Sequence, residues 1–169
     1  KLVLDLHESF DSWYWGFSSG LVKFVLRKYS PSVDRSTTVV GNLVEQHRQF
    51  GLAPVIIRNI PAIPSQSTTL KITDKEKIHL IHHGVASHTR STDLMIRVVA
   101  LCDPRYDLHL VFTNEKSRYV NKLRRLAEEI APGRVTFLPA YPALEIVENI
   151  AKFDIGFFPI PPKNYNYLI

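Results

Sequence analysis

The sequence has little of several features, and each shortage excludes a class of protein. It contains one cysteine, Cys102, among 169 residues, so it holds neither a disulfide framework nor a CxxC metal site. It has no run of about 18 apolar residues, which excludes a membrane-spanning helix. It also lacks a repeat of the solenoid type. The apolar neighbours of Cys102 predict a buried, unreactive thiol in a reducing compartment.

The charge balance is basic without pointing to a polyanion. Lysine and arginine outnumber aspartate and glutamate by 21 to 16, which gives a net charge of +5. The densest basic cluster, residues 116–125, is followed at once by Glu128 and Glu129, a pattern typical of a solvated helix face. No aromatic-basic motif accompanies it, so we expect no nucleic-acid partner.

Hydrophobic periodicity predicts an α/β fold in two halves. Apolar runs predict strands and apolar residues at helical spacing predict helices, and their alternation favours parallel sheets. In the first half the expected strands cover residues 2–6, 37–40 and 54–57, and the helices 13–29 and 41–50. In the second half the expected strands cover residues 77–82, 108–113, 134–138 and 155–158, and the helices 92–102, 115–131 and 143–153.

A stretch rich in proline, serine and threonine separates the two halves. We therefore predict a first domain over residues 1–61, a linker over 62–76 and a second domain over 77–169. The chain starts at Lys1 rather than methionine and stops at Ile169 directly after an aromatic-rich loop. We expect it to be part of a longer protein, incomplete at both ends.

Ligands of parallel sheets bind at the carboxyl ends of strands, which directs attention to the loops there. His7 and Glu8 follow the first strand, where an imidazole can donate a hydrogen bond to a hydroxyl or a developing charge. The loop over residues 83–90 contains Gly84, which lets the backbone approach a phosphate, and Arg90, which could clamp a diphosphate. The alternatives, an imidazole that caps backbone and a plain surface turn, stay open.

Two further groups of residues have less specific interpretations. Four histidines lie within ten residues, but their spacing is not HExxH and no carboxylate cluster accompanies them, so we expect no metal site. Trp13, Tyr14 and Trp15 precede a basic segment and could form an interfacial helix at a membrane, or else core packing with a solvated end. The basic residues of that segment are Lys23, Arg27 and Lys28.

The order of short motifs resembles one family along the whole chain. Residues 5–8 are similar to the D-x-H-E strand end, and residues 56–61 to the v-I-x-N-x-P segment, of retaining family 4 glycosyltransferases with the two-Rossmann-domain GT-B fold. His83 and Gly84 resemble the start of the first loop of that family's second domain, and Arg90 stands where a basic phosphate ligand is expected. Residues 134–139 resemble the V-x-F-l-G strand, and residues 151–159 the a-D-i-g-x-x-P strand.

The resemblance implies transfer of a hexose from a UDP- or GDP-sugar to a glycan, lipid or small-molecule acceptor, with retention. It implies no cofactor and no metal, and a cytoplasmic or membrane-peripheral protein. His7 and Glu8 would be catalytic, with His7 against the transferred sugar. Gly84 and Arg90 would hold the diphosphate of the donor. The nucleotide base would lie near Ala140 and Tyr141.

This sequence also departs from the family pattern. Val85 stands where a basic residue often follows the loop glycine, and Pro139 where a glycine is usual. The acidic motif of the family would lie beyond Ile169, so we expect the chain by itself to be inactive. A GT-B nucleotide-sugar 2-epimerase and a non-catalytic basic binding module are the alternative functions.

Overall fold

The computed structural model describes residues 1–7, 17–60 and 76–159. Contacts divide the chain into two compact units, whose described parts are residues 1–7 and 17–60 (unit 1) and residues 76–159 (unit 2). Each unit has its own sheet and its own hydrophobic cluster, so each is described by itself.

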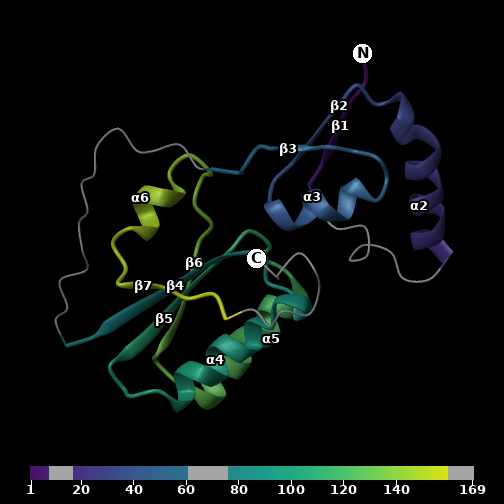
Figure 1. Ribbon diagram of the computed structural model, residues 1–169. Coiled ribbons are helices and arrows are strands. Elements are labelled where there is room, and N and C mark those ends of the chain that lie inside the picture. The colour runs from purple at the N-terminus through teal and green to yellow at the C-terminus, as the bar shows by residue number, and fades with distance from the viewer. Residues whose placement is uncertain (8–16, 61–75, 160–169) are drawn as a thin grey trace. The chain divides into compact units, whose positions relative to one another are not determined.

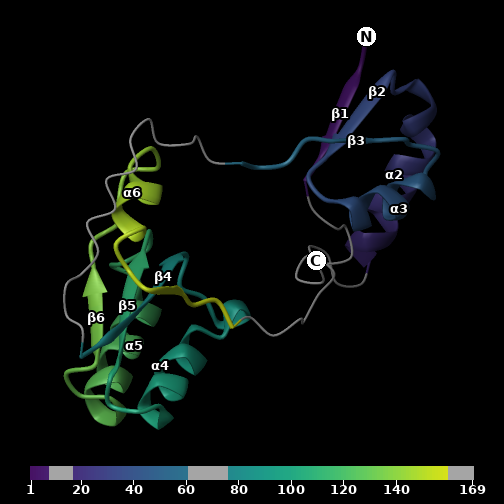
Figure 2. The same cartoon turned by 60° about the vertical axis from the view of Figure 1, so that its left-hand side comes forward.

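Unit 1 is built on a parallel sheet in the order β1-β2-β3, formed by Val3–Leu6, Arg35–Thr38 and Val55–Ile56. Two helices, α2 (Phe17–Tyr29) and α3 (Gly41–Arg48), join these strands, and the short 3-10 helix η1 (Ser30–Ser32) follows α2 (Figures 1 and 2). The proline at the start of η1 cannot continue an α-helix. A small cluster of Leu6, Phe50 and Leu52 forms the hydrophobic core of unit 1.

Unit 2 is built on a four-stranded parallel sheet in the order β6-β5-β4-β7. Its strands are β4 (Ile78–Gly84), β5 (Tyr106–Phe112), β6 (Val135–Leu138) and β7 (Ile155–Gly156). Its helices are η2 (His88–Arg90), α4 (Thr92–Leu101), α5 (Arg118–Ile130) and α6 (Ile146–Ile150). In both views of the ribbon, α4 and α5 lie side by side against one face of this sheet.

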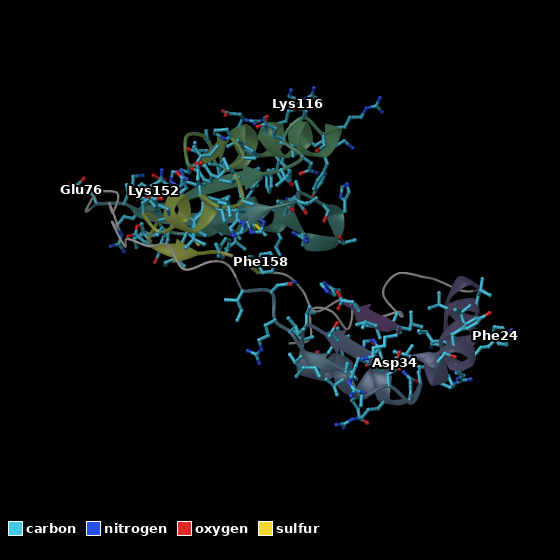
Figure 3. All side chains as sticks on the ribbon, turned by 90° about the horizontal axis from the view of Figure 1, so that it is seen from above. Phe24, Asp34, Glu76, Lys116, Lys152 and Phe158 are labelled. Atoms are coloured by element: carbon cyan, nitrogen blue, oxygen red, sulfur yellow. The ribbon has the colours of Figure 1, made fainter. Side chains whose placement is uncertain are left out.

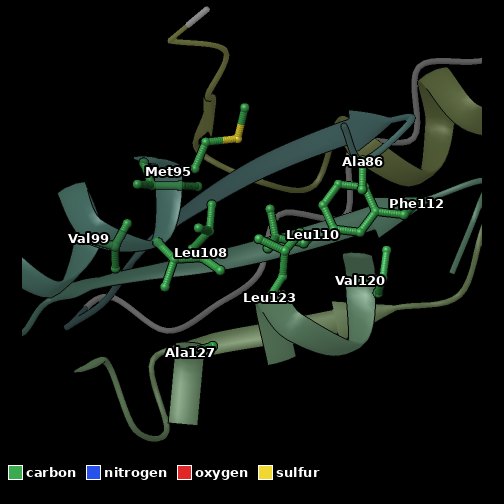
Figure 4. Packing of buried hydrophobic residues seen from close by; sticks show 11 residues of the cluster. Ala86, Met95, Val99, Leu108, Leu110, Phe112, Val120, Leu123 and Ala127 are labelled. Carbon is green, nitrogen blue, oxygen red and sulfur yellow. The ribbon is translucent and has the colours of Figure 1, made fainter. Parts of the chain in front are cut away.

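The core of unit 2 follows from strand alternation. Every second residue of β5 points to the face under α4 and α5, so Leu108, Leu110 and Phe112 are all at most 1% exposed. From the helices, Met95 and Leu123 pack onto this stripe together with neighbours one turn away (Figure 4). This layer of buried side chains between the sheet and the helices α4 and α5 holds the strand ends of unit 2 in place.

The prediction of an α/β fold with parallel sheets is confirmed, with differences at the element ends. β2 ends at Thr38 rather than at residue 40, because Val40 already occupies the N-cap position of α3. Cys102 is half-buried rather than buried, because it lies just beyond the last residue of α4. Neither α6 nor β7 extends as far as its apolar pattern predicts.

Candidate functional site

The strand order of unit 2 reverses at β4. From β4 the chain proceeds to β5 and β6 on one side, and later returns as β7 on the other side of β4. Such a reversal leaves a crevice at the carboxyl ends of the strands, where open α/β sheets bind their ligands. Gly84, the last residue of β4, lies at this position.

Gly84 and Arg90, predicted as a pair from the sequence, are brought together by the structure. The backbone of Gly84 has φ 139°, a conformation that residues with a side chain rarely adopt. A Cβ atom at this position would lie 3.0 Å from Nη1 of Arg90, so the guanidinium covers the glycine backbone. Arg90 reaches back because η2 turns the chain directly after the loop, with Ser87 Oγ accepting a hydrogen bond from Arg90 N at 3.3 Å.

The loop between Gly84 and Arg90 is braced from two sides. The side chain of Asn114, just after β5, accepts from Ala86 N and donates to Ala86 O, both at 2.9 Å. Thr92 Oγ1 donates to Ser87 O at 3.2 Å at the start of α4. These bonds fix the loop's backbone without using the side chain of Arg90, which leaves its guanidinium available to a ligand.

His82 is the buried titratable group nearest to this loop along β4. Its side chain is 2% exposed, and its ring stacks on Phe158 with centroids 5.3 Å apart. Nδ1 lies 3.1 Å from Phe157 O, and Nε2 has no hydrogen-bond partner among the described residues. Burial lowers the pKa of His82 to about 4, and the charge of Arg90 contributes in the same direction. His82 is therefore neutral at physiological pH.

Ala140 and Tyr141 lie further along the same edge of the sheet. They follow β6, which is separated from β4 by β5, so the two loops are about 10 Å apart across the sheet. Ala140 is exposed and Tyr141 is half-buried, with Lys152 Nζ 5.9 Å from its ring centroid. No described contact joins them to Gly84 or Arg90.

A shallow hollow opens between these loops at the end of β5. It has a volume of about 280 Å³ and is lined by residues 113–117, among them Asn114 and Lys116. Lys116 projects from the surface just before α5 (Figure 3). The hollow thus adds a cationic side chain to the strand-end edge that carries Gly84.

In unit 1, His7 lies directly beyond β1 and contacts Asp5. His7 Nε2 is 2.7 Å from Asp5 Oδ2, and Thr37 Oγ1 on β2 donates to Asp5 Oδ1 at 2.6 Å. The hydrogen bond from Thr37 is the main cause that lowers the pKa of Asp5. His7 is half exposed, so its ring is accessible to a ligand at this strand end.

Other predicted residues are only partly covered by the structure. Glu8 and the aromatic residues 13–15 lie outside the described residues. The neighbouring part of α2 is described, and it exposes Leu21, Phe24 and Val25. Phe24 is labelled on this helix in Figure 3. Among the described residues, no three histidine, cysteine or acidic side chains converge as a metal site would require. No helix in the described part of the chain has the length and apolarity needed to cross a bilayer.

Sequence patterns did not identify every residue of the site. Asp5 could have been found, because residues two apart on a strand point to the same face and Asp5 precedes His7 by two. Thr37 and Asn114 gave no such signal, since their roles depend on which strands are neighbours and in what register.

No protein-family model and no curated protein sequence matches the chain. Solved structures do. HepE of Anabaena, crystallised in complex with UDP, matches with a TM-score of 0.70 and 18% identity over 92% of this chain and 45% of HepE. A variant of S. aureus TarM, in complex with Fondaparinux, alpha-GlcNAc-glycerol and UDP, matches with 0.64 and 16% over 91% of this chain and 31% of TarM.

A third matching structure is that of an enzyme named for its activity. The lipopolysaccharide outer core galactosyltransferase WaaB, in its apo form, matches with a TM-score of 0.56 and 14% identity over 86% of this chain and 39% of WaaB. The fold is that of GT-B glycosyltransferases. The chain spans less than half the length of each of these GT-B proteins.

Proposed function

We propose that this chain is the central part of a glycosyltransferase that transfers a hexose from a nucleotide-diphosphate sugar to an acceptor, with retention. The observation that carries the proposal is the Arg90 guanidinium over the backbone of Gly84, at the strand reversal of a GT-B fold. Solved proteins of this fold bind UDP or UDP-glucose, which supports a nucleotide-sugar donor.

In this proposal the diphosphate of the donor occupies the strand-end edge of unit 2. Gly84, which has no side chain, leaves room for the Arg90 guanidinium beside its backbone, and the guanidinium donates two parallel hydrogen bonds to the phosphate oxygens. As the sugar leaves the nucleotide, negative charge builds up on the diphosphate, and the cation stabilises that charge in the transition state. The chain's own residues supply this stabilisation, so the proposal requires neither cofactor nor metal.

The remaining proposed roles rest on the resemblance of the sequence motifs to the family. His7 contacts the transferred sugar, with Glu8 beside it in the sequence, and Ala140 and Tyr141 lie near the nucleotide base. Residues 1–61 form the C-terminal part of one Rossmann-like domain, residues 62–76 a linker and residues 77–169 the first part of the donor-binding domain. A glycan, lipid or small-molecule acceptor, and a peripheral contact with a membrane through the segment that leads into α2, stay predictions.

The role of Arg90 is tested by comparing two arginine variants in donor binding. Arg90→Ala removes the guanidinium over Gly84, and Arg97→Ala removes the same charge from the exposed side of α4, where Arg97 pairs with Asp93 at 3.7 Å. Isothermal titration with UDP and GDP should show at least about a tenfold weaker affinity for Arg90→Ala, because a charge-assisted pair contributes about 1.5–3 kcal/mol. Arg97→Ala should bind like wild type.

The reaction itself is tested by product analysis. Incubation of the whole protein that contains this chain with UDP-hexoses and candidate acceptors should yield free UDP and a glycoside with the anomeric configuration of the donor, measured by NMR. A product of changed sugar configuration that forms without any acceptor would instead identify a 2-epimerase. If neither nucleotide binds at millimolar concentration, the proposal fails and a binding module becomes the better interpretation.

A further inference from the structure

The carboxylate of Asp5 is held by two elements at once. β1 and β2 pair with Asp5 opposite Thr37, so the hydroxyl of Thr37 meets Oδ1 at 2.6 Å across the strands. The other oxygen, Oδ2, lies 2.7 Å from Nε2 of His7. Strand pairing therefore fixes the carboxylate, and the carboxylate in turn orients the imidazole at the strand end.

This arrangement decides which nitrogen of His7 carries the proton. An ionised carboxylate can only accept hydrogen bonds, and its pKa lies below the ordinary value. Thr37 donates through its hydroxyl, so His7 must donate through Nε2–H. The neutral ring then presents Nδ1 as a hydrogen-bond acceptor.

We propose that Asp5, supported by Thr37, is a positioning residue that holds His7 as the Nε2–H tautomer, so that Nδ1 accepts a hydrogen bond from a hydroxyl of the bound sugar. This inference rests on the proposed function. It specifies the ligand group that this edge of unit 1 recognises: a hydrogen-bond donor such as a pyranose hydroxyl, rather than a carbonyl or a phosphate oxygen. A sugar whose hydroxyl at that position is replaced by hydrogen or fluorine loses this bond.

The substitution Asp5→Asn reverses the arrangement with little change of shape. The amide oxygen of asparagine still accepts from Thr37, so its NH₂ group faces His7 and donates to Nε2. His7 must then carry its proton on Nδ1 and lose its acceptor toward the sugar. Thr37→Val removes the second hydrogen bond of the carboxylate, whereas Thr37→Ser keeps it.

The first test observes the tautomer directly. Long-range ¹H–¹⁵N correlation spectra of histidine-labelled protein at pH 8 distinguish the two tautomers, with the His7 signal assigned by its loss in His7→Gln. A free imidazole in water already favours Nε2–H, so the decisive sample is Asp5→Asn, in which we expect a shift to Nδ1–H. His83, exposed on β4, should keep its signal as an internal reference. An unchanged His7 tautomer in Asp5→Asn would overturn the inference.

The second test measures turnover of the donor by the same variants, made in the whole protein that contains this chain. Asp5→Asn should lower kcat by at least about tenfold with KM for the nucleotide sugar within about twofold, and Thr37→Ser, which keeps the hydroxyl, should have a higher kcat than Thr37→Val. The double variant Asp5→Asn/His7→Ala should be no slower than His7→Ala, because Asp5 acts through His7. Full additivity of the two effects would contradict a positioning role.

The two proposals fail in different ways. If the whole protein that contains this chain turns over no nucleotide sugar, the proposed function fails while the tautomer experiment still reports on Asp5 and His7. If wild type is active and Asp5→Asn keeps both its rate and its His7 tautomer, only the positioning role fails. Should Asp5→Asn not fold, as judged by circular dichroism, Thr37→Val replaces it: the proposal requires a lowered kcat in that variant, and a wild-type rate contradicts it.

Discussion

At the scale of single residues, Gly84 is the position at which backbone and side-chain constraints coincide. Replacement by alanine puts a side chain at φ 139° and a Cβ atom 3.0 Å from Arg90 Nη1. We expect Gly84→Ala to lower the unfolding free energy by about 1–3 kcal/mol through backbone strain. It should also weaken UDP binding, because the guanidinium must move. Urea unfolding and isothermal titration measure the two effects.

A second glycine provides the matched control. Gly20 lies inside α2, where an added Cβ atom would meet no other atom within 4 Å. Gly20→Ala should therefore raise the unfolding free energy by about 0.5–1 kcal/mol, because alanine loses less conformational freedom in a helix. Its UDP affinity should equal that of wild type. Wild-type stability and affinity in Gly84→Ala would show that the loop adopts another conformation.

His82 makes the stability of the protein depend on pH. Its pKa is about 4 in the folded chain against about 6.5 when unfolded, so the unfolded chain binds the extra proton first as pH falls. The contribution of His82 to the unfolding free energy is therefore fully present above about pH 6.5. It is lost progressively toward pH 4, by about 3 kcal/mol in total. Urea unfolding of wild type at pH 7.5 and pH 5 should show the loss.

The contribution of His82 can be separated from that of other histidines. Burial also lowers the pKa of His47 and His109, so they act with the same sign in every variant. His82→Phe keeps an aromatic ring against Phe158 but cannot be protonated, so the loss between pH 7.5 and pH 5 should shrink. An equal loss of stability in this variant would assign the pH dependence to His47 and His109.

At the scale of elements, the start of α5 depends on one hydroxyl. Ser117 is the N-cap, and its Oγ accepts a hydrogen bond from Val120 N at 3.2 Å. Ser117→Ala should lower the unfolding free energy by about 1 kcal/mol, since the loss of an N-cap costs about that much. Ser117→Asp, which caps equally well, should retain wild-type stability. Equal destabilisation by both variants would mean that packing rather than capping matters here.

The same element shows what the sequence could predict. The apolar spacing of Val120, Leu123 and Ala127 identified α5 and its buried face, because one stripe of a helix must meet the sheet. The predicted start at residue 115 was wrong by three residues, since the hydrophobic pattern does not register a cap. Short elements such as β7, which covers Ile155–Gly156, end where their pairing with the neighbouring strand ends. The local sequence pattern does not show where that pairing ends.

The candidate site was predictable to the extent that its residues are close in sequence. Gly84 and Arg90 belong to one loop, so the strand-end rule found both. Asp5 and His7 share a strand face. Thr37 and Asn114 act across 32 and 28 residues of chain, through strand neighbours that alternation of hydrophobic residues does not specify.

At the scale of the whole molecule, the described parts of the two units differ in how much apolar surface they bury. Unit 2 has a cluster that extends across β4 and β5 to two helices, with most of its members almost fully buried. The cluster of unit 1 comprises Leu6, Phe50 and Leu52 with three partly buried neighbours, and β3 is exposed at both of its residues. Burial of apolar surface is the main favourable contribution to folding, so unit 2 should be the more stable of the two.

Hydrogen exchange measured by mass spectrometry tests this difference within one molecule. Amides of β4 and β5 should exchange through the largest opening free energies in the chain, because their opening disrupts the whole unit 2 cluster. Amides of β1 and β2 should exchange earlier, through openings that expose fewer buried side chains. Leu110→Ala, which removes a fully buried side chain from the unit 2 core, should lower the unfolding free energy of unit 2 by about 2–5 kcal/mol. The exposed Leu144→Ala should leave the exchange pattern unchanged. If Leu110→Ala accelerated exchange equally in β1 and β2, the two units would open as a single cooperative structure despite their separate cores.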